Sequence, residues 1–275
     1  MYSGSTMTVF SGRLIGAHQK IDRLARTNLE RLAPDSRFPN TRSILHFEGR
    51  HGPDAIKRKS PAKDEPWHFL QPFDPDDTHL IGLIERHYKQ LVDALKEKDE
   101  VRASFEAAWL AHAVVDGLTP AHHYPYEEKL MELSSGSGNA ARTTIGKKLI
   151  VPGRSPGHQV RNNWKMWGPK GLFTTHAAFE MGVAYLIVPL KSTSRRLRLT
   201  SDKIEQFEAQ SLPEWFRNTA QEVARLELYD AFYKSGWTIG LARRVRNQLT
   251  PILVQAVELV WYGALVEAGL AGHSR

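Results

Sequence analysis

Apolar residues recur along most of this chain with the spacing of an α-helix. Between residues 10 and 32 they fall on one helical face, and the same spacing runs through 78–95, 99–118 and 172–188. In the last third of the chain the same spacing predicts two or three amphipathic helices, the final one from about Thr250 to Leu270. Strand signals are few, and no internal repeat or domain boundary is evident. The pattern predicts an all-α protein, folded as a single multi-helix domain over residues 1–275.

Three segments interrupt the helical pattern. Residues 34–78 carry seven prolines and are expected to be irregular. The Ser/Gly-rich stretch 134–139 predicts a turn or flexible loop, and residues 150–171 are rich in Gly and Pro and hold Trp164 and Trp167. Long segments without elements of their own are often functional, so site residues are expected in the first of them.

The composition limits the chemistry. Because the chain has no Cys, disulfides, thiolate metal sites and a cysteine nucleophile are excluded, and any metal must be held by His, Asp and Glu. No basic start is followed by an apolar core, and no apolar run reaches the roughly 20 uninterrupted residues of a membrane span. We therefore expect no transmembrane segment and a cytoplasmic location as the default, with export still open.

The net charge of +7 is concentrated in two places. Residues 141–170 hold seven basic and no acidic residues, and a second basic run, KSTSRRLRLT, occupies 191–200. Basic patches attract phosphate-bearing partners, either nucleic acid or anionic lipid. The alternative is a solvated surface that only keeps the protein dispersed, and both interpretations stay open at this point.

The candidate chemistry centres on the motif AWLAHAVVDGLTPAHH. His112 and Asp116 are four residues apart on a predicted helix, so both side chains project from one face. His122 follows just after Pro120, where the chain can turn back toward the same point. Ligand-type residues among Ala, Val and Leu need a reason to be buried, and a metal supplies one. The competing interpretation is an ordinary surface pair.

Other candidate ligands occur in three further segments. His176 and Glu180 repeat the four-residue spacing on a second apolar helix, although they could be a helix-start residue and a solvated charge. Asp54 and His68 lie in the proline-rich segment, where Asp64 is a competing carboxylate. His18 lies on the first predicted helix, where a lone His is more often a core residue than a ligand.

Together these positions resemble the zinc-dependent phospholipase C family, whose relatives include the fungal single-strand-specific nucleases. The resemblance covers roughly residues 10–190 and rests on His-x3-Asp-x5-His combined with His-x3-Glu. It implies an all-helical fold with a cluster of zinc ions in a cleft. By position, the implied ligands are Asp54, His68, His112 and Asp116 for one zinc, His122, His176 and Glu180 for a second, and His18 with a bridging Asp116 for a third.

The resemblance also implies a mechanism. Water on zinc has a pKa near about 7, so a metal-bound hydroxide would attack a phosphodiester at neutral pH. Asp54 and Asp116 are the catalytic candidates, with Asp54 able to orient the water as a general base. The family completes its third zinc with the amino and carbonyl groups of an N-terminal Trp, whereas no Trp precedes His18 here. Two or three Zn2+ ions are therefore expected.

The substrate stays open between a phospholipid and single-stranded nucleic acid. Trp67 and Phe69 are expected near the metals, where they could line a lipid or a base pocket, or simply pack onto the core. Two other classes compete with the hydrolase. One is a catalytically inactive helical protein with a structural zinc that binds a phosphate-bearing partner. The other is a di-iron carboxylate protein, which is disfavoured because that class uses Glu-x-x-His pairs three apart.

Overall fold

The structure is a computed structural model that describes residues 16–34, 36–49, 51–56, 67–134, 136, 138 and 144–271, except for the side chains of residues 145 and 148. It is 72% helical, and the described residues contain no strand, which confirms the all-α prediction.

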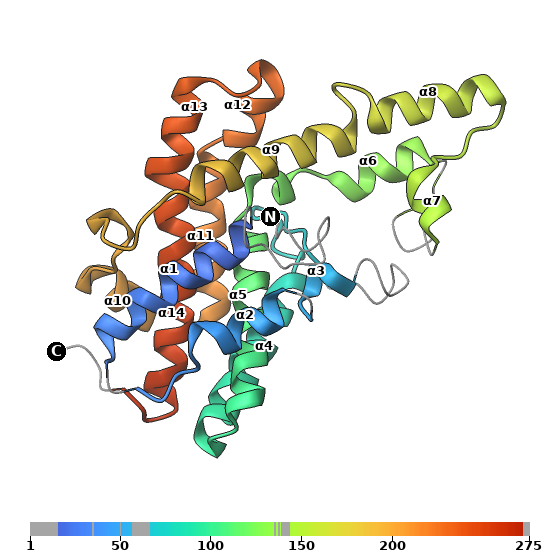
Figure 1. Cartoon of the computed structure of the whole chain (residues 1–275). Helices are drawn as coiled ribbons and strands as arrows, with labels where there is room; N and C mark the ends of the chain where they lie inside the picture. The colour runs from blue at the N-terminus through green and yellow to red at the C-terminus, as the bar shows by residue number, and fades with distance from the viewer. Residues whose placement is uncertain are drawn as a thin grey trace.

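Figure 1 shows the arrangement of the helices. The elements are α1 (Ala17–Leu32), α2 (Thr41–Glu48), α3 (Pro53–Ile56), α4 (His79–Glu97), α5 (Glu100–Gly117), η2 (Pro120–His123), α6 (Tyr126–Leu133), α7 (Ile145–Leu149), α8 (Pro156–Trp167), α9 (Leu172–Ile187), η4 (Arg195–Leu197), α10 (Ser201–Glu208), α11 (Leu212–Arg225), α12 (Leu228–Ser235), α13 (Ile239–Arg244), η5 (Val245–Leu249) and α14 (Thr250–Glu267).

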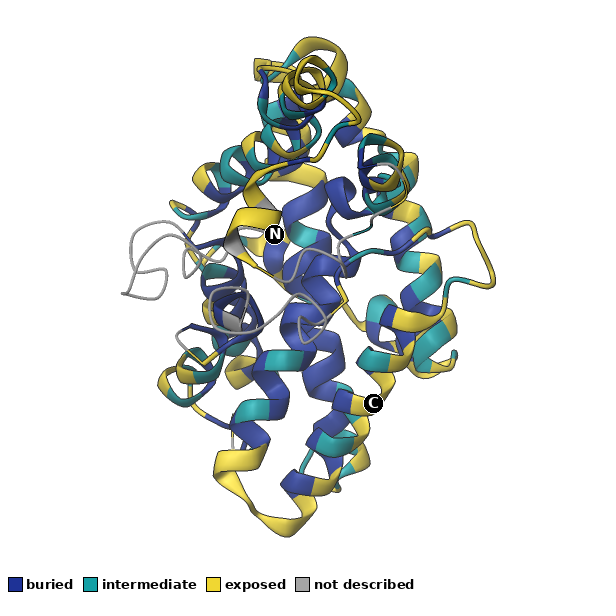
Figure 2. Ribbon diagram, turned by 90° about the vertical axis from the view of Figure 1, so that its right-hand side faces the viewer, coloured by how far each residue is buried: buried dark blue, intermediate teal, exposed yellow. Residues whose placement is uncertain are grey.

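Two apolar helices, α5 and α14, lie at the centre of the molecule. Both are buried along most of their length, and Figure 2 shows that the helices in the middle of the molecule are mostly dark blue, that is, buried. The Trp261 indole of α14 donates a hydrogen bond to the Ala107 carbonyl of α5 at 3.0 Å. At Gly117 a Cβ atom would lie 2.6 Å from the Phe216 ring and 2.7 Å from Leu80, so only Gly allows α4 and α11 to approach the end of α5 this closely.

One continuous helical run has the length and hydropathy of a membrane span. It extends from Ile239 to Glu267, through α13, η5 and α14. However, 83% of its most apolar 18-residue window is buried inside the protein. Within the part of the chain that the structure describes, this run is therefore packed as a core helix of the fold. The cytoplasmic location and the single-domain organisation stay predictions.

The structure corrects three sequence-based expectations about elements. Residues 34–78 are not wholly irregular, because they contain α2 and α3, and the Asn40 side chain accepts a hydrogen bond from the Ser43 amide at the start of α2. Residues 150–171 contain the helix α8, which begins after the capping residue Ser155 with Pro156 in its first turn. In its described part, the last third has three helices, α10, α11 and α12, followed by the continuous run from α13 to α14, rather than two or three helices in all.

The helices α6, α7 and α8 project from the helical body (Figure 1). We call the described part of residues 126–167 the α6–α8 lobe. It has a small apolar cluster of its own, formed by Tyr126, Leu130, Val151 and Met166. The Trp167 indole donates to the Leu149 carbonyl at 2.8 Å and so holds α8 against α7. The described helices of the lobe therefore pack on one another, whereas residues 135, 137 and 139 of the predicted Ser/Gly-rich turn lie outside the described residues.

Candidate metal centre

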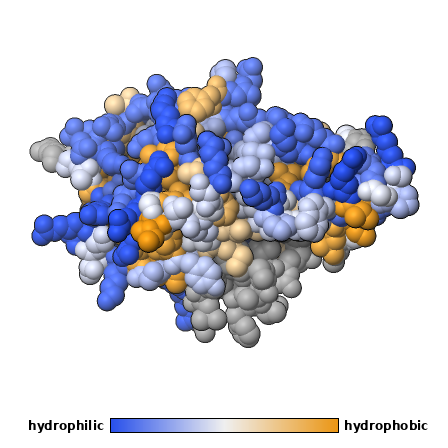
Figure 3. Space-filling view, turned by 90° about the horizontal axis from the view of Figure 1, so that it is seen from above, coloured by the Kyte–Doolittle hydropathy of each residue, from blue (hydrophilic) through white to orange (hydrophobic). Residues whose placement is uncertain are grey.

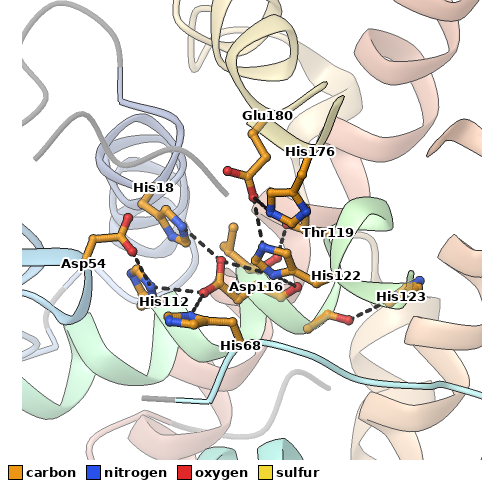
Figure 4. Close-up of polar contacts among 12 residues, drawn as sticks. His18, Asp54, His68, His112, Asp116, Thr119, His122, His123, His176 and Glu180 are labelled. Atoms are coloured by element: carbon orange, nitrogen blue, oxygen red, sulfur yellow. Dashed lines mark hydrogen bonds and ion pairs between the residues drawn. The ribbon is translucent and has the colours of Figure 1, made fainter. Parts of the chain in front are cut away.

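All eight predicted ligands come together at one end of α5, as Figure 4 shows for the labelled side chains. They come from elements that are far apart in the sequence. Helix α1 supplies His18, α3 supplies Asp54, the segment before α4 supplies His68, α5 supplies His112 and Asp116, η2 supplies His122, and α9 supplies His176 and Glu180.

The Asp116 carboxylate lies in the middle of the centre, with four histidines around it. Its Oδ2 atom lies 2.5 Å from Nδ1 of His68 and 3.1 Å from Nε2 of His112. Its Oδ1 atom lies 3.3 Å from Nε2 of His18 and 3.6 Å from Nδ1 of His122. The residue is 1% exposed. One buried carboxylate that faces four imidazoles is well placed to bridge two cations.

Asp54 borders the same group of residues. Its Oδ1 atom lies 3.9 Å from Nε2 of His112, and the side chain is buried. The short helix α3 places this carboxylate opposite α5, although the sequence predicted no element there. The competing Asp64 lies outside the described residues.

A second cluster lies beside Asp116 and joins η2 to α9. Glu180 Oε1 is 2.9 Å from Nε2 of His122 and 3.2 Å from Nε2 of His176, and the two imidazole rings are stacked with their centroids 5.2 Å apart. Nδ1 of His122 lies 3.0 Å from the Asp116 carbonyl, so it can donate to that oxygen. This hydrogen bond selects the tautomer whose Nε2 atom is available to a metal.

Burial and charge set the protonation states of the centre. Burial lowers the pKa of His18 to about 3 and that of His122 to about 4, which keeps both rings neutral. Burial alone would raise the pKa of Asp116, but nearby positive charges, including His112, hold it well below its usual value. Burial opposes charge on His112 as well, yet Glu48 and Asp116 raise its pKa to about 10. Neutral imidazoles and ionised carboxylates are the forms that bind metals, so metal binding would displace one proton from His112.

The donor set fits zinc. Nε2 of His112 and both ring nitrogens of His18 are buried and, apart from their ion-pair contacts with Asp116 and Glu48, make no hydrogen bond within the described part of the chain. Buried polar atoms normally have partners, so these nitrogens are atoms that a cation would satisfy. Imidazole nitrogen and carboxylate oxygen without sulfur are ligands that zinc accepts. The groups His68, His112, Asp116 and His122, His176, Glu180 each bring three ligand atoms within 4.8 Å of one another.

Glu48 is a residue of the centre that the sequence analysis missed. It is fully buried at the end of α2, with Oε1 3.1 Å from Nδ1 of His112 and 4.0 Å from Nδ1 of His18. The His18 and His112 rings are stacked, with centroids 4.0 Å and planes 7° apart. Both Nε2 atoms therefore face Asp116, and both Nδ1 atoms face Glu48. A carboxylate in this position can hold two histidines in the orientation that metal ligands need, and Glu48 could also complete a site with them.

Replacing Glu48 with Gln is expected to weaken zinc binding by about ten- to a hundredfold while leaving the number of ions at saturating zinc unchanged, because the ligands remain but lose their orientation. Competition with a chromophoric chelator measures the affinity, and long-range ¹H–¹⁵N spectra of the histidines report the tautomer directly. Loss of one whole zinc ion at saturation would instead identify Glu48 as a direct ligand.

Trp67 and Phe69 lie beside the centre. The Phe69 ring is 5.4 Å from that of His122 and stacks on Tyr126 at 5.5 Å. Trp67 contacts Phe69 at 5.8 Å between ring centroids and is 36% exposed. Phe69 therefore belongs to the wall of the second cluster, and Trp67 lies further out. Their predicted role in substrate binding stays a prediction.

Two other features lie outside the ligand set. His123, next to His122 in the sequence, faces away from the centre, and its Nε2 atom is in hydrogen-bond contact with the Gly117 carbonyl at 2.8 Å (Figure 4). The second basic run lines a groove of about 540 Å³ with Arg243 and Arg246, and none of the predicted ligands lines that groove.

The fold is similar to that of one solved toxin structure, the alpha-toxin of Clostridium perfringens isolated from avian strain SWCP. The TM-score is 0.56 at 15% sequence identity, and the match covers 94% of this chain and 65% of the toxin chain. This chain thus spans about two thirds of the toxin's length. No protein-family model matches the sequence, and no curated protein matches it. At this identity the likeness establishes a shared fold.

Proposed function

We propose that this protein is a zinc-dependent phosphodiester hydrolase that acts on phospholipids. The observation that carries the proposal is the buried Asp116 carboxylate, which faces four histidines and adjoins the cluster of His122, His176 and Glu180. The alpha-toxin with the similar fold is a zinc phospholipase C, in agreement with the family that the sequence motifs resemble. This agreement supports a phospholipid over a nucleic acid as the substrate.

The proposed ligand sets follow the two clusters. Asp54, His68, His112 and Asp116 would hold one ion, and His122, His176 and Glu180 would hold another. His18 and Asp116 would contribute to a third. When bound, zinc polarises phosphoryl oxygens and lowers the pKa of water.

The other parts of the proposed reaction depend on side chains of the protein itself. Asp54, at the edge of the first cluster, would accept a proton from the attacking water as a general base. Phe69 and Tyr126 form an apolar wall beside His176, with the Tyr126 and His176 ring centroids 5.4 Å apart. This wall would restrict water around the ligands of the second cluster and offer an apolar contact to a lipid. Asp116 would hold the two clusters in a fixed relation to each other.

Metal content and substrate preference test the proposal together. Untagged protein is expected to contain about two or three zinc ions by elemental mass spectrometry. It should release a phosphorylated headgroup from mixed phospholipid micelles, and chelation should abolish this activity. Hydrolysis of single-stranded DNA with no action on phospholipid would contradict the substrate assignment. Bound zinc with no hydrolysis of either substrate would support the inactive binding protein, and absence of metal with no activity after added zinc would reject the hydrolase.

A further inference from the structure

The α6–α8 lobe begins and ends at the candidate metal centre. The chain leaves the centre at His122, forms the lobe, and returns through α9 to His176. At the base of the lobe, Tyr126 stacks on Phe69 and contacts the ring of His176. A surface on this lobe is therefore connected directly to two of the candidate ligands.

The outer face of the lobe is apolar and exposed. On α8, Pro156, Val160 and Trp164 are four residues apart and lie along one face, whereas Asn162 and Met166 point inward and are buried. Val160 is 71% exposed and Trp164 is 68% exposed. Together with Ile150 from the end of α7, these residues open onto a groove of about 660 Å³. The groove is lined by Ile150, Pro156, Gln159, Val160, Asn163, Trp164, Trp167 and Gly168.

Cations surround this apolar face, and no acidic residue occurs between positions 133 and 179. Arg154, Arg161, Lys165 and Lys170 are all exposed. The lobe forms the right-hand end of the molecule in Figure 3, where hydrophobic and strongly hydrophilic residues lie next to one another. An exposed helix with Trp and aliphatic side chains between basic residues has the composition of a segment that lies in the interface of an anionic membrane.

We propose that the outer face of α7 and α8 docks the protein onto an anionic lipid surface. Its aliphatic residues favour lipid over nucleic acid, because a single-stranded nucleic acid is bound mainly by aromatic platforms and cations. Val160 and Ile150 can enter the apolar layer, while Arg161 and Lys165 contact lipid phosphates. In one respect the inference rests on the proposed function: docking by this face would bring substrate lipids to the metal centre at the base of the lobe.

Cosedimentation with vesicles tests the docking surface without relying on hydrolysis. The zinc-loaded protein is incubated in the cold with vesicles of phosphatidylcholine and phosphatidylglycerol, or of phosphatidylcholine alone. Val160→Glu is expected to weaken partitioning onto the mixed vesicles by about ten- to a hundredfold, because burial of the side chain in the interface is lost. Lys165→Glu is expected to weaken it by about tenfold or more on the anionic vesicles only.

Val101→Glu is the matched control, because Val101 is 69% exposed on α5, outside the lobe. It should partition like the native protein. Equal partitioning of Val160→Glu and Val101→Glu would overturn the proposal, as would binding of single-stranded DNA, but not of vesicles, in a Val160-dependent way. Vesicle binding that depends on Val160 without any lipid hydrolysis would uphold the docking surface and reject the proposed function.

Discussion

Replacing Asp116 with Asn is expected to reduce phosphodiesterase activity by at least about a thousandfold and to remove at least one zinc ion per chain. Asn has nearly the same shape but no charge, and the Asp116 carboxylate faces four histidines within 3.6 Å. The histidines would then lack the anion that balances a bound cation. Activity on a phospholipid and zinc content by elemental mass spectrometry measure the two effects. His112→Ala should behave in the same way.

Glu106→Gln provides the control for this prediction. Glu106 is also a fully buried carboxylate on α5, but its partners are His87 at 2.6 Å and Arg102 at 2.5 Å, away from the predicted ligands. This variant should lose stability and keep its zinc. If Asp116→Asn retained full activity and all of its zinc, the assignment of the centre would be wrong.

Replacing Glu258 with Gln is expected to stabilise the protein by about 2 to 4 kcal/mol at pH 9 and by little at pH 4. Glu258 is 2% exposed on α14, and burial raises its pKa to about 8, although hydrogen bonding from Asn28 opposes the shift. Below about pH 4.5 the group is protonated in both the folded and the unfolded chain, so it carries no penalty. As the pH rises from 4.5 to about 8, the unfolded chain loses this proton first, and the folded state becomes progressively less stable.

The Gln variant has no ionisable group at this position, so its free energy of unfolding does not fall for this reason as the pH rises. Urea unfolding of both proteins at a series of pH values measures the difference in free energy of unfolding. Glu222→Gln, on the exposed side of α11, is the control and should show no pH-dependent gain. A constant difference between Glu258→Gln and the native protein across this range would contradict the assignment.

The sequence predicts the ligands of the centre better than their surroundings. The spacing of His112 and Asp116 places both on one face of α5, and the structure brings Nε2 and Oδ2 to 3.1 Å. Periodicity alone could not show that His18 and His176, on other helices, reach the same end of α5. That convergence depends on tertiary packing, in which α1 contacts α14, α5 and α9. The expectation that these residues converge came instead from the resemblance to a known family.

Glu48 and α8 show what sequence analysis can miss. Glu48 is one of 30 acidic residues, and its segment was expected to be irregular because of its prolines. The cap of α2 at Asn40 was a usable signal, but nothing local shows that the Glu48 carboxylate is buried against His112. For α8, Ser155 followed by Pro156 is a standard helix start, which the high Gly and Pro content of the segment obscured.

The position of the lobe between His122 and His176 also has a consequence for folding. A cation bound by these two residues and Glu180 would close residues 122–180 into a loop, as a covalent cross-link does. Closing a long loop removes conformational freedom from the unfolded chain and so stabilises the folded one. In a protein without cysteines, the metal would therefore act as a cross-link in the place of a disulfide. Removal of the metal by a chelator would open this loop and expose the lobe to proteases before the central helices unfold.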